Sequence, residues 1–537
     1  MRQASAGVRA TATSPAPSHA AVDRPARRKH VEAALRARAR PASSRRWPPP
    51  EGRLGADEDH GDRLRQTLTD LGPVFGGFGR YLASRVDLLA RRTRADLAAI
   101  PDEGVALLAP AVAALIHAQL GALPDRLFFE FHEAPFAVGS WTEHHLAWLS
   151  PGVPATVTIV RPDAAAEIEA DLPLLPLLAP WLDLPESVLT AAIDDYAQTL
   201  RRRLDQKHQA SSLATLAADA RRGGGFDAPV CYRDHCAPNI LTIERLAGST
   251  LEAEPGAGEA LARRVTGAWI RHAFSGNVVP YDFGPRDIVM AGDRLVLTGA
   301  VFEPHPATEH GRFAAYLSAV AADDPDAAAN WILEGASQSV GVEVTLRHLL
   351  RRAVPFREGE WSGDDRLAEY ALVQWRVARD AGWLMSPHHQ HVYRGLHAVA
   401  RIADALAPDA DALRGALEDE RLRIGLAQAG QLADPRHAAV TLERAIQELI
   451  DLPQKLDDVL TLASEGRLRM RLQVPEAEAN ERVRNRTVLL VTTLVAFAGL
   501  ASLLHQLAPG FGAGVERAGA VILLVVGGWL LLAAARL

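Results

Sequence analysis

The chain has 537 residues and a net charge of −7, from 58 lysines and arginines and 65 aspartates and glutamates. Its length allows roughly two to four domains, or one large domain with appendages. Because phosphate contacts need a basic face, the acidic balance argues against a dedicated nucleic-acid-binding protein, and we expect no nucleic acid as a partner. Cys231 and Cys236 are the only cysteines, so no disulfide framework supports the fold, and their spacing is wrong for a zinc knuckle.

Residues 1–60 are rich in Ala, Arg, Ser and Pro. No apolar core follows Met1, so we expect no secretory signal peptide. A segment of this composition buries too little apolar surface to fold, which predicts a disordered basic leader. An organelle transit peptide has a similar composition and is the alternative interpretation.

A helical N-terminal extension is predicted over residues 61–125. Apolar residues recur at helical spacing over residues 65–100 and again over residues 105–120. The run Gly76-Gly77-Phe78-Gly79 interrupts the first of these helices. It lacks the preceding strand and the following Lys-Ser/Thr of a phosphate loop, so a helix kink or close packing is the better interpretation.

Two further regions form the predicted lobes. Residues 126–250 mix short strands with helices, and residues 251–475 are mostly helical apart from one hairpin. The hairpin has strands at residues 288–290 and 294–298, joined by the turn Ala291-Gly292-Asp293. Strands early and helices late predict an α+β fold with two lobes. The other expected strands lie near residues 128–131, 155–160, 230 and 240–244, and the other helices cover residues 168–182, 185–214, 260–274 and most of 309–450.

Two uncharged apolar runs, at residues 487–507 and 518–535, are each close to the roughly 20 residues that a membrane-spanning helix needs. Arginines flank the pair, so the positive-inside tendency keeps both ends in the cytoplasm. Residues 467–474 alternate apolar and basic side chains, which predicts a strand whose basic face lies against anionic headgroups. We therefore predict a C-terminal two-helix transmembrane hairpin over residues 487–535, with membrane lipids as its partner. The expected location is a bacterial inner membrane, with the folded lobes in the cytoplasm.

The order of these parts resembles the UbiB/AarF family of atypical kinase-like proteins over residues 68–537. The resemblance rests on LTDLGPVFGGFGRYLASRVDLL, EFHEAPFAVGSW, IVRP followed by IEADLPLL, and LPQKLDDVLTLASEGRLRMRLQVP before the apolar hairpin. It implies a protein-kinase-like two-lobed fold whose helical extension packs over the active site. It also implies ATP and Mg²⁺ as cofactors, weak ATPase activity, and a role in the biosynthesis of ubiquinone and related isoprenoid lipids, with the enzymes of that biosynthesis as expected partners.

The resemblance also assigns the nucleotide-binding positions. The family's alanine-rich loop falls on Ala137, Val138, Gly139 and Ser140 and is partly kept. The family's strand lysine, which holds the α- and β-phosphates, falls on Thr158. Its glutamate partner, from Glu-Leu-Asp-Tyr, falls on Arg203 in RLDQ, and Lys-x-Gly-Gln falls on Gly77-Phe78-Gly79-Arg80. A hydroxyl and a guanidinium cannot form the family's ion pair.

The catalytic positions follow in the segment PYDFGPRD. The catalytic Asp of the family's His-Ala-Asp-Pro-His-Pro-Gly-Asn loop falls on Asp282, and its metal-binding Asn falls on Asp287, a hard oxygen ligand suited to Mg²⁺. The metal-binding Asp of Asp-Phe-Gly falls on Gly299, which removes the main ligand of the ion that bridges the phosphates. Asp282-Phe283-Gly284 spells this motif but precedes both hairpin strands, so we interpret it as a coincidental tripeptide.

Two histidine runs are candidate metal ligands. Glu143-His144-His145 and His388-His389-Gln390-His391 lack the helical HExxH spacing, and we interpret them as solvated side chains in loops or on helix surfaces.

The sequence leads to two hypotheses. In the first, the chain is a membrane-anchored pseudokinase that acts as a scaffold or a lipid-binding regulator in isoprenoid-quinone or related lipid metabolism. In the second, it is an active atypical ATPase or kinase in which Asp282 and Asp287 share Mg²⁺. We favour the first, because phosphoryl transfer depends on the charges that this chain lacks.

Overall fold

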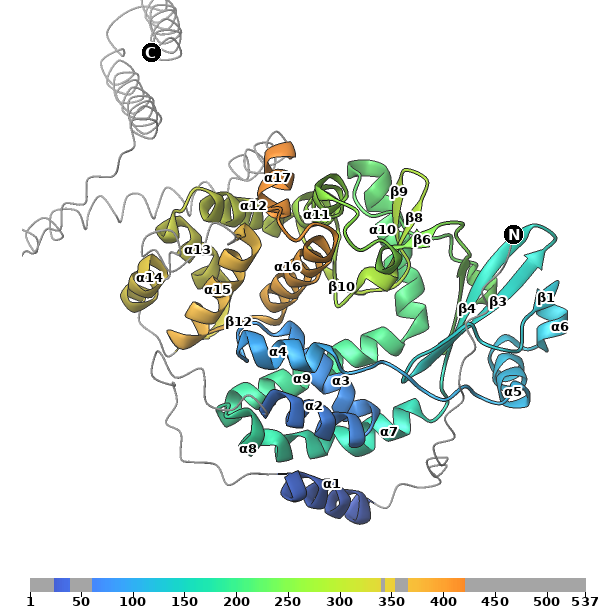
Figure 1. Ribbon diagram of the computed structural model, residues 1–537. Coiled ribbons are helices and arrows are strands. Elements are labelled where there is room, and N and C mark those ends of the chain that lie inside the picture. Colours follow the sequence, from blue (N-terminus) through green and yellow to red (C-terminus); the bar gives the residue numbers. More distant parts are fainter. Residues whose placement is uncertain (1–23, 39–59, 340–342, 353–365, 421–537) are drawn as a thin grey trace, which may run out of the picture. The chain divides into compact units, whose positions relative to one another are not determined.

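The computed structural model describes residues 24–38, 60–339, 343–352 and 366–420 (Figure 1). The basic strand expected at residues 467–474 and the membrane hairpin expected at residues 487–535 lie outside this part of the chain. Among the helices that are described, none combines the length and the apolar character needed to span a bilayer.

Helix α1 (Arg24–Arg38) lies inside the segment for which the sequence predicts disorder, so that prediction is wrong for these residues. Val31 and Leu35 are one helical turn apart, and both are buried. The Arg27 guanidinium bonds the buried Asp171 carboxylate at 2.5 Å and also donates to the Leu71 carbonyl at 2.6 Å. The composition of the leader is polar, but a few apolar and charged contacts still hold this helix against the fold.

The single helix predicted over residues 65–100 is three helices. They are α2 (His60–Asp70), α3 (Pro73–Ser84) and α4 (Arg91–Ala98). The first break falls at Pro73, because proline is favoured at the first position of a new helix and cannot continue an old one. The glycines of α3 are buried, and a Cβ added at Gly77 would collide with the Tyr196 hydroxyl. Close packing of the glycine run is therefore confirmed.

An antiparallel sheet in the order β1-β3-β4-β5, with β2 also paired to β3, forms the first lobe. Residues 142–150 form the long strand β3, which the sequence did not predict. Val112 and Ile116 of α5 belong to the same apolar cluster as Val157 and Ile159 of β4, so this helix covers one face of the sheet (Figure 1). The elements are α5 (Ala109–Leu120), α6 (Pro124–Leu127), β1 (Glu130–Phe131), β2 (Ala137–Val138), β3 (Thr142–Ser150), β4 (Val153–Val160) and β5 (Ile240–Glu244).

The helical stretch between β4 and β5 also divides where the sequence predicts continuity. The expected helix over residues 185–214 breaks at Asp205, whose carboxylate accepts the His208 backbone N–H at 3.0 Å and caps a new helix. No strand forms near residue 230, where the described backbone makes only isolated bridges. The elements are α7 (Ala164–Asp171), the 3₁₀ helix η1 (Leu172–Leu178), α8 (Ala179–Leu182), α9 (Glu186–Leu204), α10 (Gln206–Gly223) and η2 (Arg233–His235).

The second lobe is built around α11 and one hairpin. The hairpin of β8 and β9 forms where the sequence predicts it, and β10 returns to pair antiparallel with β7, with Val301 opposite Tyr281. The fully buried Trp269 of α11 donates to the Pro280 carbonyl at 3.0 Å, which fixes β7 against the helical core. The elements up to α12 are β6 (Ser249–Thr250), η3 (Leu251–Ala253), α11 (Glu259–Ser275), β7 (Val278–Tyr281), η4 (Pro285–Asp287), β8 (Ile288–Ala291), β9 (Arg294–Leu297), β10 (Val301–Pro304) and α12 (Ala307–Ala321).

The remaining helices gather beside α11 and α12 (Figure 1). Trp331 and Trp375 are buried among them. The expected α+β fold is therefore confirmed for the part of the chain that is described. These last elements are α13 (Pro325–Gly335), β11 (Ala336–Ser339), α14 (Glu343–Arg352), α15 (Leu367–Asp380), β12 (Trp383–Met385), α16 (Pro387–Leu406) and α17 (Ala412–Asp419).

Candidate functional site

The loop from Asp282 to Asp287 connects β7 to the β8–β9 hairpin. Asp282 follows the last residue of β7, and its backbone is left-handed, with φ of 50°. Aspartate tolerates this conformation better than most residues, but it still costs about 1–2 kcal/mol. Such strain is retained where the surrounding structure holds the residue in place, and it is often found at functional sites.

Two arginines hold the Asp282 carboxylate. Arg203 in the last turn of α9 donates to Oδ2 at 3.1 Å, and Arg394 of α16 donates to Oδ1 at 3.2 Å. The Arg394 side chain is 1% exposed, whereas the Arg203 side chain is 41% exposed. Both oxygens that would accept a proton or bind a metal are therefore engaged by guanidinium groups. We call these three residues the Asp282 clamp.

Arg394 is itself held by a buried carboxylate. Its Nη1 lies 3.4 Å from Asp195 Oδ2, and Asp195 Oδ1 is 2.6 Å from Nε2 of His391. Although burial opposes ionisation, the hydrogen bond from His391 and the charge of Arg394 hold the pKa of Asp195 well below its usual range. The helical repeat explains the arrangement, because His391 and Arg394 are three residues apart and share one face of α16.

The same histidine bonds a second carboxylate on β10. His391 Nδ1 lies 2.8 Å from Glu303 Oε2, which also accepts from Arg202 Nη1 at 2.7 Å. The His391 ring stacks on Tyr281 with 4.1 Å between ring centroids. His391 thus connects Asp195 and Glu303, so β7, β10, α9 and α16 share one polar network.

The N-terminal extension enters this network through one face of α3. The Tyr81 hydroxyl donates to Asp195 Oδ2 at 2.7 Å, and Arg394 Nε donates to Ser84 Oγ at 3.1 Å. Arg85, one helical turn after Tyr81, donates to the Tyr81 hydroxyl at 2.5 Å. The extension therefore supplies part of the polar shell behind the Asp282 clamp.

Asp287 and Gly299, the two positions that the resemblance assigns to metal ligands, are neighbours. A Cβ added at Gly299 would lie 3.2 Å from Asp287 Oδ1. The other carboxylate oxygen accepts the Gly284 backbone N–H at 2.8 Å, and burial raises the pKa of Asp287 against the opposing charge of Arg203. The structure thus brings Asp282, Asp287 and Gly299 together as the motif order predicts, with glycine where an acid is expected.

The nucleotide-binding positions in the sheet meet across β3. Thr158 of β4 is opposite His144 of β3, and the Thr158 hydroxyl lies 2.9 Å from His144 Nδ1. Ala137 of β2 pairs with His144 from the other side. Burial lowers the pKa of His144 to about 4, so this imidazole is neutral at pH 7. No positive charge stands at the lysine position.

The small-residue loop is tied to the extension by Asp102. Ser140 Oγ donates to Asp102 Oδ1 at 2.7 Å, and Arg80 Nη2 donates to the same oxygen at 2.8 Å. Although burial opposes ionisation, Arg80 and the Ser140 hydrogen bond hold the pKa of Asp102 below its usual value. Asp102 also acts electrostatically on Arg203, which connects this loop to the Asp282 clamp. Val138 and Gly139 belong to the same hairpin, and their roles stay predictions.

The two histidine runs are not solvated, so that interpretation is wrong. His145 is fully buried on β3, and its Nε2 lies 3.0 Å from the buried Glu143 Oε1. His389 and His391 are buried in α16, because this helix runs through the core and not over the surface. In the part of the chain that the structure describes, no three His, Cys, Asp or Glu side chains are placed to hold a metal ion together.

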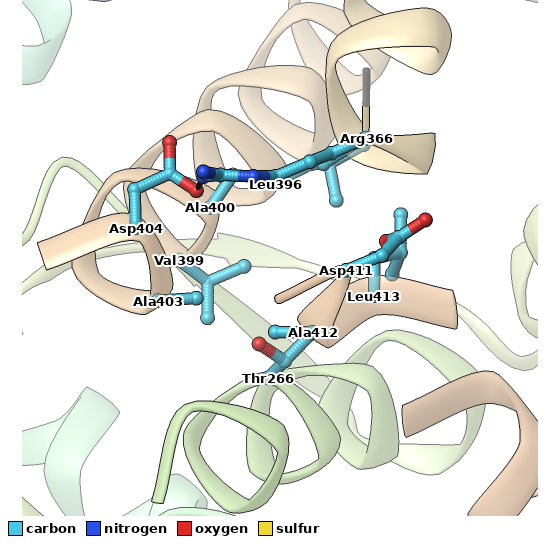
Figure 2. Close-up of a pocket in the computed structure, with 11 residues that line it drawn as sticks. Thr266, Arg366, Leu396, Val399, Ala400, Ala403, Asp404, Asp411, Ala412 and Leu413 are labelled. Atoms are coloured by element: carbon cyan, nitrogen blue, oxygen red, sulfur yellow. Dashed lines mark hydrogen bonds and ion pairs between the residues drawn. The ribbon is translucent and has the colours of Figure 1, made fainter. Parts of the chain in front are cut away.

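Figure 2 shows a small pocket between α11, α16 and α17 in which Arg366 bonds Asp404. Its cavity volume is about 10 Å³, which leaves room for no more than about one water molecule. The pocket is not lined by any residue of the Asp282 clamp. It therefore belongs to helix packing and not to a ligand site.

A protein-family model described as the ABC1 atypical kinase-like domain matches residues 102–296. Curated relatives named "Probable protein kinase UbiB" match as well. The one from Azotobacter vinelandii is 32% identical over 208 residues, covering 38% of each chain. Residues 102–296 therefore belong to the ABC1 atypical kinase-like domain family. A second UbiB relative, from Pseudomonas aeruginosa strain LESB58, is 29% identical over 260 residues, covering 46% of this chain and 48% of the relative.

The chain thus spans less than half the length of these UbiB relatives in each match. The matched family domain is kinase-like, and it contains Thr158, Arg203, Asp282 and Asp287 but ends before Gly299. A solved complex of Rv3197 with erythromycin from Mycobacterium tuberculosis aligns with 71% of this chain and 92% of that chain. Its identity of 15% and TM-score of 0.37 are too low to support an inference.

The residues of this kinase-like domain do not fit a bound Mg²⁺-nucleotide. Two guanidinium groups occupy the Asp282 oxygens, and glycine stands at the position of the second acid. Thr158 and a neutral His144 replace the cation that would grip the phosphates.

The sequence did not reveal Arg394, Asp195 or Glu303, and it gave His391 only as part of a solvated histidine run. Asp195 lies on α9, Glu303 on β10, and His391 and Arg394 on α16, so no spacing pattern connects the three elements.

Proposed function

We propose that this chain is a catalytically degenerate UbiB/AarF member, a pseudokinase that supports ubiquinone or related isoprenoid-lipid metabolism. It acts as a scaffold or a lipid-binding regulator of the enzymes of that metabolism, and residues 487–535 anchor it in a bacterial inner membrane with the kinase-like lobes in the cytoplasm. The observation that carries the proposal is the Asp282 clamp. The catalytic carboxylate bonds two arginines of its own chain.

The clamp matters because phosphoryl transfer is catalysed mainly by positioned charge. A kinase-like site needs a cation on the strand and free acidic oxygens for Mg²⁺. Here the acidic helix position has become Arg203, and its guanidinium turns toward the catalytic acid. The reversal of charge at one helix position thus removes the partner of the strand lysine and also occupies the catalytic residue.

The second candidate is an atypical ATPase or kinase in which Asp282 and Asp287 share Mg²⁺. It is favoured by the position of Asp287 Oδ1, which faces Gly299 with no side chain between them. This activity requires Arg203 and Arg394 to release Asp282 when the nucleotide enters.

A thermal-shift assay of the full chain with ATP, with and without Mg²⁺, separates the two. The pseudokinase is expected to show no Mg²⁺-dependent stabilisation. A ligand held by an intact site at 100 times its Kd would add about 2.7 kcal/mol, an easily measured shift. A Mg²⁺-dependent shift that Asp287→Ala abolishes, and that the exposed control Asp125→Ala keeps, would establish the second candidate.

The membrane anchor has its own test. Full-length protein is expected to stay in the membrane pellet during alkaline carbonate extraction, as an integral protein does. Release into the supernatant would remove the anchor from the proposal without affecting the Asp282 clamp.

A further inference from the structure

A cavity that no residue of the Asp282 clamp lines lies between the end of α10, α11 and the turn of the β8–β9 hairpin. Its volume is about 350 Å³. We call it the arginine cavity, because four arginines line it together with two aspartates. They are Arg221, Arg264, Arg271, Arg294, Asp227 and Asp293.

The four guanidinium groups differ in how far their charge is compensated. Arg294 is fully paired, with Nε and Nη2 at 2.8 and 2.6 Å from Asp227 Oδ2. Arg264 bonds only the neutral backbone carbonyl of Asp293. Arg221 is exposed, and no hydrogen bond or ion pair holds it among the described residues. Two positive charges therefore face the cavity without a carboxylate partner.

Arg271 supplies a donor that nothing satisfies. Its Nη1 bonds Glu420 at 2.5 Å, but its Nε is buried and has no hydrogen-bond partner among the described residues. A buried N–H of a charged group that is left unpaired destabilises the fold. An acceptor in the cavity would remove that cost.

The glycine run after α10 keeps the wall of the cavity thin. Gly225 has φ of 120°, and a Cβ there would lie 2.6 Å from His272 Nε2. Only glycine lets the backbone pass this close to α11, so no side chain of that turn fills the space beside Arg264 and Arg271. A basic residue at the C-terminal end of α10 compensates the dipole of that helix, which explains the presence of Arg221. It does not explain the other three arginines, which belong to α11 and β9.

We propose that the arginine cavity binds a small anion with two or more negative charges, of the diphosphate class. Guanidinium groups match phosphate oxygens with paired hydrogen bonds, and a volume near 350 Å³ is at the lower end for ligand pockets, which span about 300–1,000 Å³. The anion is either free in solution or the phosphate headgroup of a lipid. This site does not depend on whether the Asp282 clamp is active.

The test is calorimetric titration of the full chain with inorganic pyrophosphate at constant ionic strength. Binding is expected to weaken about tenfold or more in Arg221→Gln/Arg264→Gln, because the variant removes two guanidinium groups that would bond the anion. Arg263→Gln is the matched control. It removes one positive charge from the residue that precedes Arg264 in α11, which pairs with Asp419 instead.

Asp287→Ala is expected to leave pyrophosphate binding unchanged, because Asp287 does not line the arginine cavity. This result would distinguish binding in the arginine cavity from binding beside Asp282 and Asp287. Absence of pyrophosphate binding, or equal loss in Arg263→Gln and the double variant, would overturn the proposal. Competition of pyrophosphate by phosphatidylcholine vesicles containing phosphatidic acid, but not by pure phosphatidylcholine vesicles, would identify a lipid headgroup as the anion. Competition by neither would identify a free anion.

Discussion

The two parts of the candidate kinase-like site, one around Asp282 and one around Thr158, have opposite electrostatic characters. At one end, Asp282 is surrounded by charge, and every group of its network is paired within the fold. At the other end, Thr158 and His144 form a neutral pair on adjacent strands. The comparison shows that the candidate site does not lack cations. They lie on helices α9 and α16, as Arg203 and Arg394, and bond the Asp282 carboxylate of the same chain.

The largest expected effect is loss of the arginine at the charged end. Arg394→Ala leaves Asp195 buried with one partner fewer and frees one oxygen of Asp282. Breaking a buried ion pair costs about 3–5 kcal/mol, so chemical denaturation should show a loss of that size in the free energy of unfolding. Arg401→Ala, exposed on the same helix, is the control and should change stability by less than about 0.5 kcal/mol. Equal losses would mean that α16 itself, and not the network, is what the substitutions disturb.

A cation placed at the neutral end should be costly. Thr158 is 8% exposed, so Thr158→Lys is expected to lose about 3 kcal/mol of stability. Arg203→Glu in the same chain restores the order of charges of an active kinase-like site. A double-mutant cycle should then give a favourable coupling of about 1 kcal/mol or more. Strict additivity would show that these two positions do not face each other.

The helix that carries Asp195 and Arg203 is positioned by close packing on α3. Gly77→Ala pushes a methyl group into the Tyr196 hydroxyl of α9, and overpacking of this kind costs about 2 kcal/mol. Gly76→Ala is the matched control on the same helix, because its Cβ would meet Ile100 at an ordinary 3.5 Å. The melting temperatures of the two variants should therefore move apart, and a common shift would contradict the packing interpretation.

The neutral end also predicts a pH dependence. In the folded protein the pKa of His144 is about 4, below the unfolded value near 6.5. Between these two pH values the imidazole is protonated in the unfolded state and neutral in the folded state. Stability is therefore lost as the pH falls from about 6.5 toward 4, by up to about 1.4 kcal/mol per pH unit from this residue. His144→Gln should reduce the slope of unfolding free energy against pH by that amount. An unchanged slope would show that His144 is protonated in the fold.

Local patterns predicted the backbone of the site better than its charges. The turn at Gly292 and the strands around it fixed where the loop of Asp282 and Asp287 would lie, because hairpin signals are short-range. Strand β3 was missed, since its polar residues Glu143 and His145 are buried, and polar side chains do not indicate burial before the sheet has formed.

The partners of Asp282 could not be found in the same way. Arg394 is 112 residues from Asp282, and the helix that carries it reaches the loop only through tertiary packing. The helix breaks at Pro73 and Asp205 lie where the apolar repeat continues. A prediction from periodicity alone therefore gave single helices where a proline and a helix cap begin new ones.

The hydroxyls of Tyr81 and Ser84 have a consequence for how this protein can be handled. Because they complete a buried shell that also includes Asp195 and Arg394, the N-terminal helices cannot be trimmed away to expose a working catalytic core. A protease that cuts ahead of Ser84 would remove the Tyr81 hydroxyl from Asp195 together with the buried apolar face of α3, and the remaining fragment is expected to unfold instead of switching on.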